Sequence, residues 1–185
     1  MPAAGLNPSE RFIVLTGGPG SGKTTLLDAL ETAGYARSME AGRAIIQDQV
    51  AIGGRALPWR DPVLFAELML SWDMRSHRAA EQLPGPVFFD RGVVDVLGYL
   101  RLVGAPVPEH VKRAVENLRY HRRVFVLPPW EEIYGQDRER KQDFLEAVRT
   151  YDAIVRAYTE FGYELVEVPR VSVFERVRFV LGSYH

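Results

Sequence analysis

The sequence predicts an α/β domain with three layers, in which helices cover both faces of a parallel sheet. Short apolar segments alternate along the chain with amphipathic ones, as expected when each strand is followed by a helix that packs back onto the sheet. A glycine-rich turn joins the first predicted strand to the first helix. The 185 residues fit one domain spanning 1–185, which is long enough to bury a substantial core.

Composition narrows the class of protein. Hydrophobic residues make up 46% and charged residues 25%, as in an ordinary globular domain. Cysteine is absent, so disulfides and thiolate metal sites are excluded. The net charge of −1 argues against a nucleic-acid partner held by excess basic charge. The chain has no apolar run of membrane-spanning length and no signal-peptide pattern, so we expect a cytoplasmic protein without a membrane span.

The first part of the chain predicts two strands and two helices. An apolar run at 12–16 indicates a buried strand. The leucine stripe after it indicates a helix that ends at Gly34. Residues 35–39 predict a second strand, and residues 41–52 predict a helix that stops at Gly53.

The middle of the chain predicts a long helix, a strand and two more helices. Asp61 is a good N-cap, and Pro62 suits the first position of the long helix, which runs to about residue 82. The apolar segment 85–90 reads as a strand that ends in a carboxylate. Residues 93–102 and 109–118 have helical patterns.

The last part predicts two strands and two helices. Residues 123–127 form an apolar strand before a pair of prolines, and 137–161 have the strongest helical period in the chain. Residues 163–168 alternate as a final strand. Ser172 and Glu175 form a capping box that opens the last helix.

The segment from Gly17 to Thr24 matches the P-loop pattern G-x-x-x-x-G-K-T, with a strand before it and a helix after it. Glycines let backbone N–H groups approach phosphate oxygens, and the helix N-terminus faces the same anion. Lys23 is expected to reach the β- and γ-phosphates of ATP, and Thr24 to ligate Mg²⁺. The predicted nucleotide-binding residues are Gly17, Gly18, Gly20, Ser21, Gly22, Lys23, Thr24 and Thr25.

Asp90 lies at the carboxyl end of a predicted buried strand, the sheet edge where ligands of α/β proteins bind. It is a candidate catalytic residue and Mg²⁺ ligand, since it can hold the metal shell or take a proton from an attacking hydroxyl. The alternative is that Asp90 only caps the next helix. Arg91, the next residue, is a candidate contact for an anionic substrate.

Each of two further groups of residues has two interpretations, one as part of the active site and one as ordinary surface residues. Glu40 and Arg43, at the end of the second predicted strand, either bracket a second substrate or form an ordinary salt bridge within one helix. Arg138, Arg140 and Lys141 lie near the start of a long predicted helix. Cations are unfavourable there unless an anion such as a polyphosphate binds nearby; the alternative is a solvated charged face.

With the P-loop, three later segments carry a resemblance to a known family: FDRG at 89–92, LPPWEEIY at 127–134 and VPRVSVFERV at 168–177. From about Arg11 to Leu181, the chain resembles the small P-loop domains called AAA domain that are related to ribosylnicotinamide kinase. More broadly it is similar to nucleoside and nucleotide kinases.

This resemblance implies a five-stranded parallel sheet in the order 2-3-1-4-5. It implies a mobile helical lid at 130–143, whose Arg138 and Arg140 reach the transferred phosphate as catalytic residues. It also implies that a loop bordering the nucleotide base consists of Val168, Pro169, Arg170 and Val171. The acceptor is expected to contact Glu40, Asp90 and Arg91.

The chain departs from its relatives in two places, and both leave the identity of the acceptor open. Gly92 stands where deoxynucleoside kinases usually have serine. The segment MEAGR at 39–43 replaces the Glu-Pro turn of thymidylate kinases.

The function expected first is a kinase that uses Mg²⁺ and transfers the γ-phosphate of ATP to a small-molecule acceptor with a hydroxyl group, such as a nucleoside, nucleotide or related metabolite. One alternative is a regulatory switch that binds ATP or GTP, hydrolyses it slowly and has a protein or lipid partner. A simple ATPase is disfavoured, since Arg91 stands where many P-loop hydrolases carry the glutamate that activates water. ATP versus GTP and the oligomeric state stay open.

Overall fold

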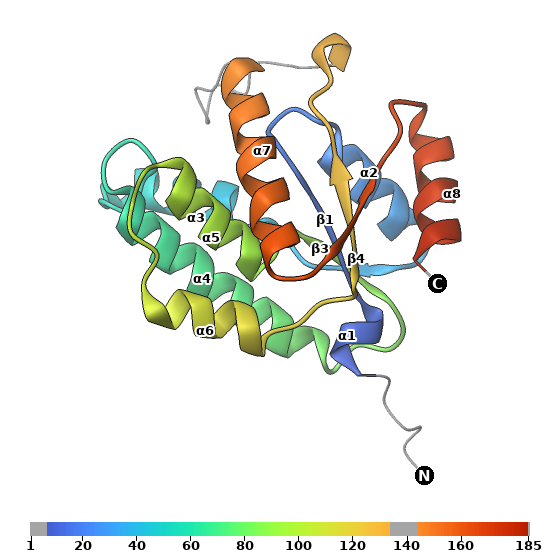
Figure 1. Cartoon of the computed structure of the whole chain (residues 1–185), viewed down its shortest axis with the longest axis horizontal. Helices are drawn as coiled ribbons and strands as arrows, with labels where there is room; N and C mark the ends of the chain where they lie inside the picture. Colours follow the sequence, from blue (N-terminus) through green and yellow to red (C-terminus); the bar gives the residue numbers. More distant parts are fainter. Residues whose placement is uncertain (1–6, 134–143, 185) are drawn as a thin grey trace.

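The computed structural model describes residues 7–133 and 144–184. Within these ranges the strands form one parallel sheet in the order β2-β3-β1-β4-β5 (Figure 1). Its strands are β1 (Phe12–Gly17), β2 (Ala36–Arg37), β3 (Val87–Asp90), β4 (Arg123–Leu127) and β5 (Glu164–Glu167). The predicted α/β class and the strand order implied by the resemblance are confirmed.

Helices cover both faces of this sheet (Figure 1). In chain order they are α1 (Pro8–Arg11), α2 (Lys23–Thr32), α3 (Ala41–Ile52), α4 (Pro62–Ala80), α5 (Val93–Leu102), α6 (Glu109–Asn117), α7 (Phe144–Glu160) and α8 (Val173–Ser183). A single turn of 3₁₀ helix, η1 (Glu131–Ile133), follows β4. Helices α2 and α8 pack on one face, and α4, α5, α6 and α7 pack on the other.

The central strand β1 separates two halves of the core. Phe12 and Val14 belong to the cluster under α4, α5, α6 and α7, whereas Ile13 and Leu15 belong to the cluster under α2 and α8. All four side chains are fully buried. A strand covered on both faces has no polar side to show, which explains why β1 reads as a continuous apolar run.

The helix ends follow the predicted local signals. Asp61 accepts a hydrogen bond from the backbone N–H of Leu64 at 3.0 Å, which caps α4. Ser172 and Glu175 form the predicted capping box of α8. Helix α3 ends where Gly53 adopts a left-handed conformation with φ of 66°.

Several predicted boundaries lie one or two residues away from the observed ones; the elements predicted at 35–39 and 137–161 are the clearest cases. The strand predicted at 35–39 is confined to Ala36–Arg37, because this edge strand pairs only with β3 and the N–H of Tyr35 still bonds to α2 at Leu30. The helix predicted at 137–161 is seen as α7 from Phe144 onward; residues 137–143 lie outside the described ranges.

Close packing explains why Gly92 carries no side chain. A Cβ atom at this position would lie 2.8 Å from Cζ of the buried Tyr120 ring. The hydroxyl of Tyr120 also accepts a hydrogen bond from the N–H of Val93, in the first turn of α5. The ring therefore fills the space that the serine of deoxynucleoside kinases would need here.

We expect Gly92→Ser to destabilise the protein by about 1–3 kcal/mol, since forcing extra atoms into a packed core displaces its neighbours. Urea unfolding monitored by circular dichroism measures the change. Gly182→Ser in α8 is the matched control, because no heavy atom lies within 4 Å of an added Cβ there. Equal losses in both variants would show that the Tyr120 contact does not restrict position 92.

Candidate active site

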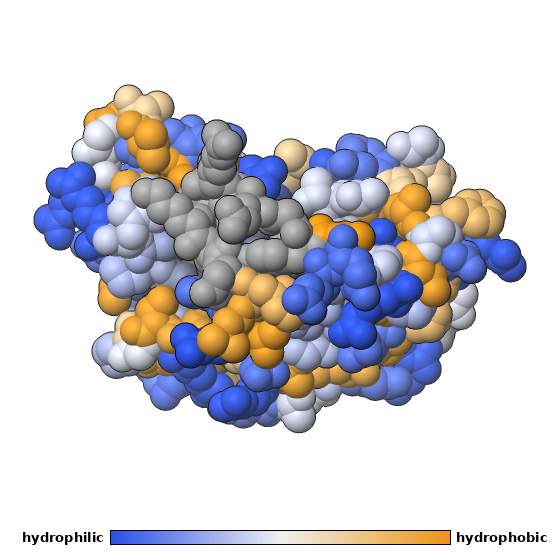
Figure 2. Space-filling view, turned by 90° about the horizontal axis from the view of Figure 1, so that it is seen from above, coloured by the Kyte–Doolittle hydropathy of each residue, from blue (hydrophilic) through white to orange (hydrophobic). Residues whose placement is uncertain are grey.

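The loops that follow β1 and β3 lie beside each other at the carboxyl edge of the sheet. Pairing of the two strands places Leu15 opposite Asp90, so the P-loop and Asp90 emerge at the same level. Figure 2 looks onto this edge, where hydrophobic and hydrophilic side chains are intermixed. Ligands of open α/β sheets bind at this edge.

The P-loop backbone requires its glycines for two reasons. At Gly17, φ is 147° and an added Cβ would lie 2.5 Å from the carbonyl oxygen of Leu127. At Gly18 the same atom would meet the carbonyl oxygen of Ala147, also at 2.5 Å. Gly22 is left-handed with φ of 80° and immediately precedes α2. Ser21 donates a hydrogen bond to the carbonyl of Gly18 at 3.0 Å, closing the loop.

The predicted metal ligand Thr24 and its neighbour Thr25 are exposed in the first turn of α2, as is Gly20 in the loop. Mg²⁺ bound with nucleotide phosphates takes few protein ligands and keeps several waters. An accessible hydroxyl on α2 and a carboxylate on β3 suit such an ion. Thr24 and Asp90 are therefore the residues that would hold it.

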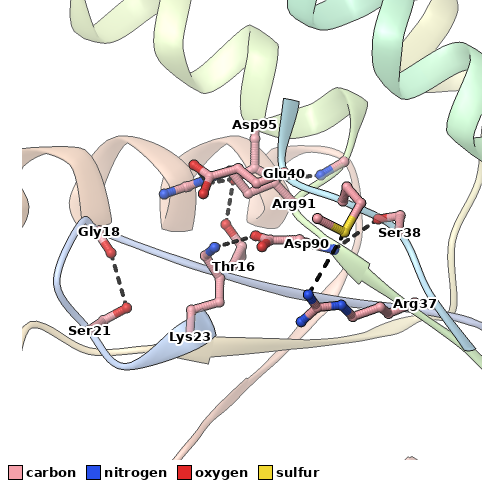
Figure 3. Close-up of polar contacts among 12 residues, drawn as sticks. Thr16, Gly18, Ser21, Lys23, Arg37, Ser38, Glu40, Asp90, Arg91 and Asp95 are labelled. Atoms are coloured by element: carbon pink, nitrogen blue, oxygen red, sulfur yellow. Dashed lines mark hydrogen bonds and ion pairs between the residues drawn. The ribbon is translucent and has the colours of Figure 1, made fainter. Parts of the chain in front are cut away.

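Lys23 and Asp90 form a buried ion pair (Figure 3). Their side chains are only 5% and 8% exposed. The segment that follows β2 also holds Asp90 in place, because the backbone N–H of Asp90 donates to the hydroxyl of Ser38 at 3.1 Å. Helix α5 begins at Val93 with Gly92 as its N-cap, so the helix-cap interpretation of Asp90 is wrong.

Asp95, which the sequence analysis did not single out, is a buried carboxylate that accepts four hydrogen bonds at this edge. It accepts hydrogen bonds from the Tyr158 hydroxyl at 2.6 Å and from the Gly92 N–H at 2.9 Å. It also accepts from the Thr16 hydroxyl and from the Arg91 guanidinium, the latter at 3.3 Å. The only sequence signal was an aspartate inside an otherwise apolar helix.

We expect Asp95→Ala to lower the free energy of unfolding by about 3–5 kcal/mol, because it leaves several buried donors and a guanidinium without their acceptor. Chemical denaturation measures this loss. Asp152→Ala, at an exposed position of α7, is the control and should change stability little. Similar stabilities of the two variants would contradict a structural role for Asp95.

Arg91 is held between two carboxylates at the start of the loop after β3. Its Nε lies 3.7 Å from Glu40, and its guanidinium bonds to Asp95. Its φ of 68° is left-handed, which is uncommon for arginine. Although burial lowers the pKa of Arg91, surrounding carboxylates raise it overall; they belong to Asp95, Glu40 and Asp90.

A mostly apolar cavity opens beside this cluster, between α3, α4, α5 and α7. It encloses about 900 Å³, including the solvent at its mouth. The P-loop residue Pro19 and the predicted substrate residues Glu40, Arg43 and Arg91 all line it. The structure therefore brings these residues together at one cavity next to the P-loop.

The structure describes only some of the remaining predicted site residues. In the loop after β5, the Val168 side chain is buried in the core and Arg170 bonds to the carbonyl of Pro129 at 2.9 Å. Arg138 and Arg140 lie outside the described residues. Arg176 was missed by sequence analysis: its guanidinium is buried, donates to the P-loop carbonyl of Gly22 at 3.3 Å and lies 5.6 Å from the Trp130 ring centre.

Comparison with known families supports this picture of a P-loop domain. The family described as AAA domain matches residues 12–176, which is most of the chain. The chain belongs to the AAA domain family. The match confirms the resemblance suggested by the P-loop and the later sequence segments.

Three solved structures show how this AAA domain folds. The NadR protein in complex with NR superposes with a TM-score of 0.70 at 18% identity, over 96% of this chain and 50% of that one. Deoxyadenosine kinase from M. mycoides with bound dATP has a TM-score of 0.60 at 14% identity, over 92% of this chain and 97% of that one. Thymidylate kinase from Ehrlichia chaffeensis has a TM-score of 0.58 at 14% identity, over 95% of this chain and 98% of that one. The chain therefore shares its fold with these three proteins, two of which are named as kinases.

One curated protein is a closer relative in sequence over a shorter stretch. The DNA replication and repair protein RecF from Agrobacterium fabrum is 32% identical over 131 residues, which cover 69% of this chain and 29% of RecF. The AAA domain thus spans less than a third of RecF and half of the NadR chain. No helix among its described residues is long and apolar enough to cross a membrane.

Proposed function

We propose that the protein is an ATP-dependent kinase that transfers the γ-phosphate to a hydroxyl group of a small molecule, such as a nucleoside, nucleotide or related metabolite. The observation that supports the proposal is the cavity, because Glu40 and Arg91 line it together with the P-loop residue Pro19. An organic acceptor needs an apolar cavity that carries a few polar groups, whereas a water molecule does not.

The P-loop amides and Lys23 would hold the β- and γ-phosphates of ATP. Lys23 then exchanges its bond to Asp90 for bonds to phosphate, which frees the carboxylate. Asp90 accepts the proton of the acceptor hydroxyl as that oxygen attacks the γ-phosphorus. The bond from phosphorus to the bridging oxygen breaks, and ADP is the leaving group.

A bound Mg²⁺, held by Thr24 and Asp90, would supply positive charge to the phosphate oxygens. Arg91 stays fixed by Glu40 and Asp95 and presents its guanidinium to the cavity, where it would orient the acceptor. Arg138 and Arg140 remain predicted to cover the transferred phosphoryl group. Such arginines exclude water and stabilise charge in the transition state.

A second candidate function is a nucleotide-binding switch with slow hydrolysis and a protein or lipid partner. The observation that favours it is the ion pair between Lys23 and Asp90, since each group contacts the other instead of a substrate. A protein that keeps this pair on binding nucleotide would turn over slowly. The two functions differ in whether an organic acceptor accelerates the formation of ADP.

The test combines the purified protein and ATP·Mg²⁺ with pools of nucleosides, nucleotides and other metabolites, and follows ADP by a coupled assay. A kinase forms ADP slowly without an acceptor and much faster with the right pool, and mass spectrometry identifies the phosphorylated product. Glu40→Gln should raise the KM of that acceptor and leave the KM of ATP unchanged. Tight nucleotide binding without any phosphorylated product would favour the switch.

A further inference from the structure

Asp73, on α4, is a buried carboxyl group that lines the cavity and has no hydrogen-bond or ion-pair partner among the described residues. Its residue is only 7% exposed, and it lines the cavity together with Glu40, Arg91 and Asp95. Asp95 uses both of its oxygens in hydrogen bonds. By contrast, the structure shows no hydrogen bond and no ion pair between Asp73 and any other described residue.

A second polar group in the same cavity is also without a partner. Tyr99, on α5, lines the cavity and packs edge-on against Phe65 with ring centres 5.5 Å apart. Its hydroxyl oxygen is buried and has no hydrogen-bond partner among the described residues. Buried polar groups in native proteins are nearly always hydrogen-bonded, so the Tyr99 hydroxyl, lining the same cavity as the unpaired Asp73 carboxyl group, indicates a place where a ligand binds.

The surroundings of Asp73 favour its uncharged form. Burial is the main cause that raises the pKa of this carboxyl well above its usual value, and the nearby carboxylate of Asp95 raises it further. Asp90 and Glu40 act in the same direction, and only Arg91 opposes them. An uncharged carboxyl group has one O–H donor and one carbonyl acceptor side by side.

We propose that the Asp73 carboxyl group and the Tyr99 hydroxyl determine which acceptor this site takes, by binding a neutral hydrogen-bonding edge of its apolar body. The inference rests on the proposed function and names its substrate class. A carboxyl group pairs well with a group that offers an acceptor and a donor side by side. Carboxamides, lactams and amino-substituted heterocycles have such edges.

The walls of the cavity suit the apolar part of such a molecule. Ile46, Phe65, Met69 and Val96 line it alongside Asp73. A flat ring placed among these side chains would present its polar edge to Asp73 and Tyr99. Glu40 and Arg91, which line the same cavity, would remain available to its hydroxyl-bearing part.

The unfolding temperature of an Asp73 variant distinguishes a purely structural role of this residue from a role in ligand recognition. A buried acid without a partner destabilises the folded state, so Asp73→Leu should unfold at the same temperature as the wild type or at a higher one. A structural residue such as Asp95 behaves in the opposite way. Thermal unfolding of Asp73→Leu therefore separates these roles before any ligand is added.

The decisive experiment measures binding of adenosine, cytidine, inosine and methyl β-riboside to the full chain by calorimetry, with a non-hydrolysable ATP analogue and Mg²⁺ present. We expect at least one nucleoside to bind, and methyl β-riboside, which lacks the base, to bind far more weakly. Asp73→Leu should lower the affinity for the nucleoside that binds by about tenfold or more, as expected when a buried hydrogen-bonding group is removed. Tyr99→Phe should lower the same affinity several-fold.

Asp73→Asn is the key control, because an amide keeps a donor and an acceptor but has no acid. It should bind the nucleoside within about threefold of the wild type, whereas Asp48→Leu on the exposed side of α3 should change nothing. The proposal is overturned if no nucleoside binds, if Asp73→Leu binds normally, or if Asp73→Asn loses as much as Asp73→Leu. The last result would show that a donor and an acceptor side by side at position 73 are not what binds the nucleoside.

These outcomes are separable from failure of the proposed function. Binding that depends on Asp73 without any phosphorylated product would remove the kinase and keep the recognition site. Phosphorylation of a nucleoside at the same KM in wild type and Asp73→Leu would keep the kinase and remove the role of Asp73. The ATP analogue should bind equally to all variants, since Asp73 lies on α4 and not in the P-loop.

Discussion

Lys23→Met is expected to abolish measurable binding of ATP and to lower turnover by about 10³-fold, the scale seen when a charge-stabilising group is removed from an active site. Lys23 is the only side-chain cation of the P-loop segment 17–25. The P-loop amides remain in the variant, so some affinity for a diphosphate is expected to survive. Calorimetry with ATP·Mg²⁺ and ADP, combined with a turnover assay, measures both effects.

The Lys23 variant also needs a test of folding, because its partner Asp90 would be left as a buried carboxylate without a cation. Breaking such a pair costs about 3–5 kcal/mol. The double variant Lys23→Met with Asp90→Asn removes both charges and should recover much of that stability without recovering activity. Lys112→Met on α6, which is far from the P-loop in sequence and exposed, is the control. Unchanged ATP affinity in a folded Lys23→Met protein would refute the P-loop assignment.

Asp90→Asn is expected to lower turnover by roughly 100-fold or more, the scale of losing a general base, while ATP affinity stays within a few-fold of the wild type. The amide keeps the shape of the side chain but loses its charge and basicity. Lys23 is released from its ion pair and remains available to phosphate. Steady-state kinetics with the acceptor found in the screen, together with ATP binding, measures the change.

The Asp90 result separates two explanations of its position. Asp28→Asn, at an exposed site of α2, serves as the control and should behave like the wild type. A turnover within a few-fold of the wild type would mean that Asp90 only anchors Lys23. The proton acceptor would then have to be sought among the carboxylates that line the cavity.

The fold was predictable because its signals are local. The continuous apolar run of β1 reflects burial on both faces, and the P-loop glycines reflect backbone conformations that other residues rarely adopt. Asp61 and Gly53 mark helix ends through capping groups next to them in sequence. Each of these signals lies within a few residues of the feature that it predicts.

The residues of the candidate site that the sequence did not reveal depend on contacts between segments far apart in the chain. Asp95 accepts from Thr16 and Tyr158, which are 79 and 63 residues away in sequence. Arg176 reaches Gly22 across 154 residues. Asp73 looks in sequence like an ordinary polar residue of a helix, and only the packing of α4 against its neighbours turns it toward the cavity. No periodicity or spacing could reveal these contacts.

The central claim is that the γ-phosphate passes to an organic hydroxyl and not to water. Phosphorus NMR of a reaction with ATP, Mg²⁺ and the pooled nucleosides, nucleotides and metabolites follows that atom directly. We predict that the γ-phosphate signal is replaced by the phosphomonoester signal of an organic product, with little inorganic phosphate. Conversion of the γ-phosphate into inorganic phosphate alone, at a rate that no pool changes, would contradict the account.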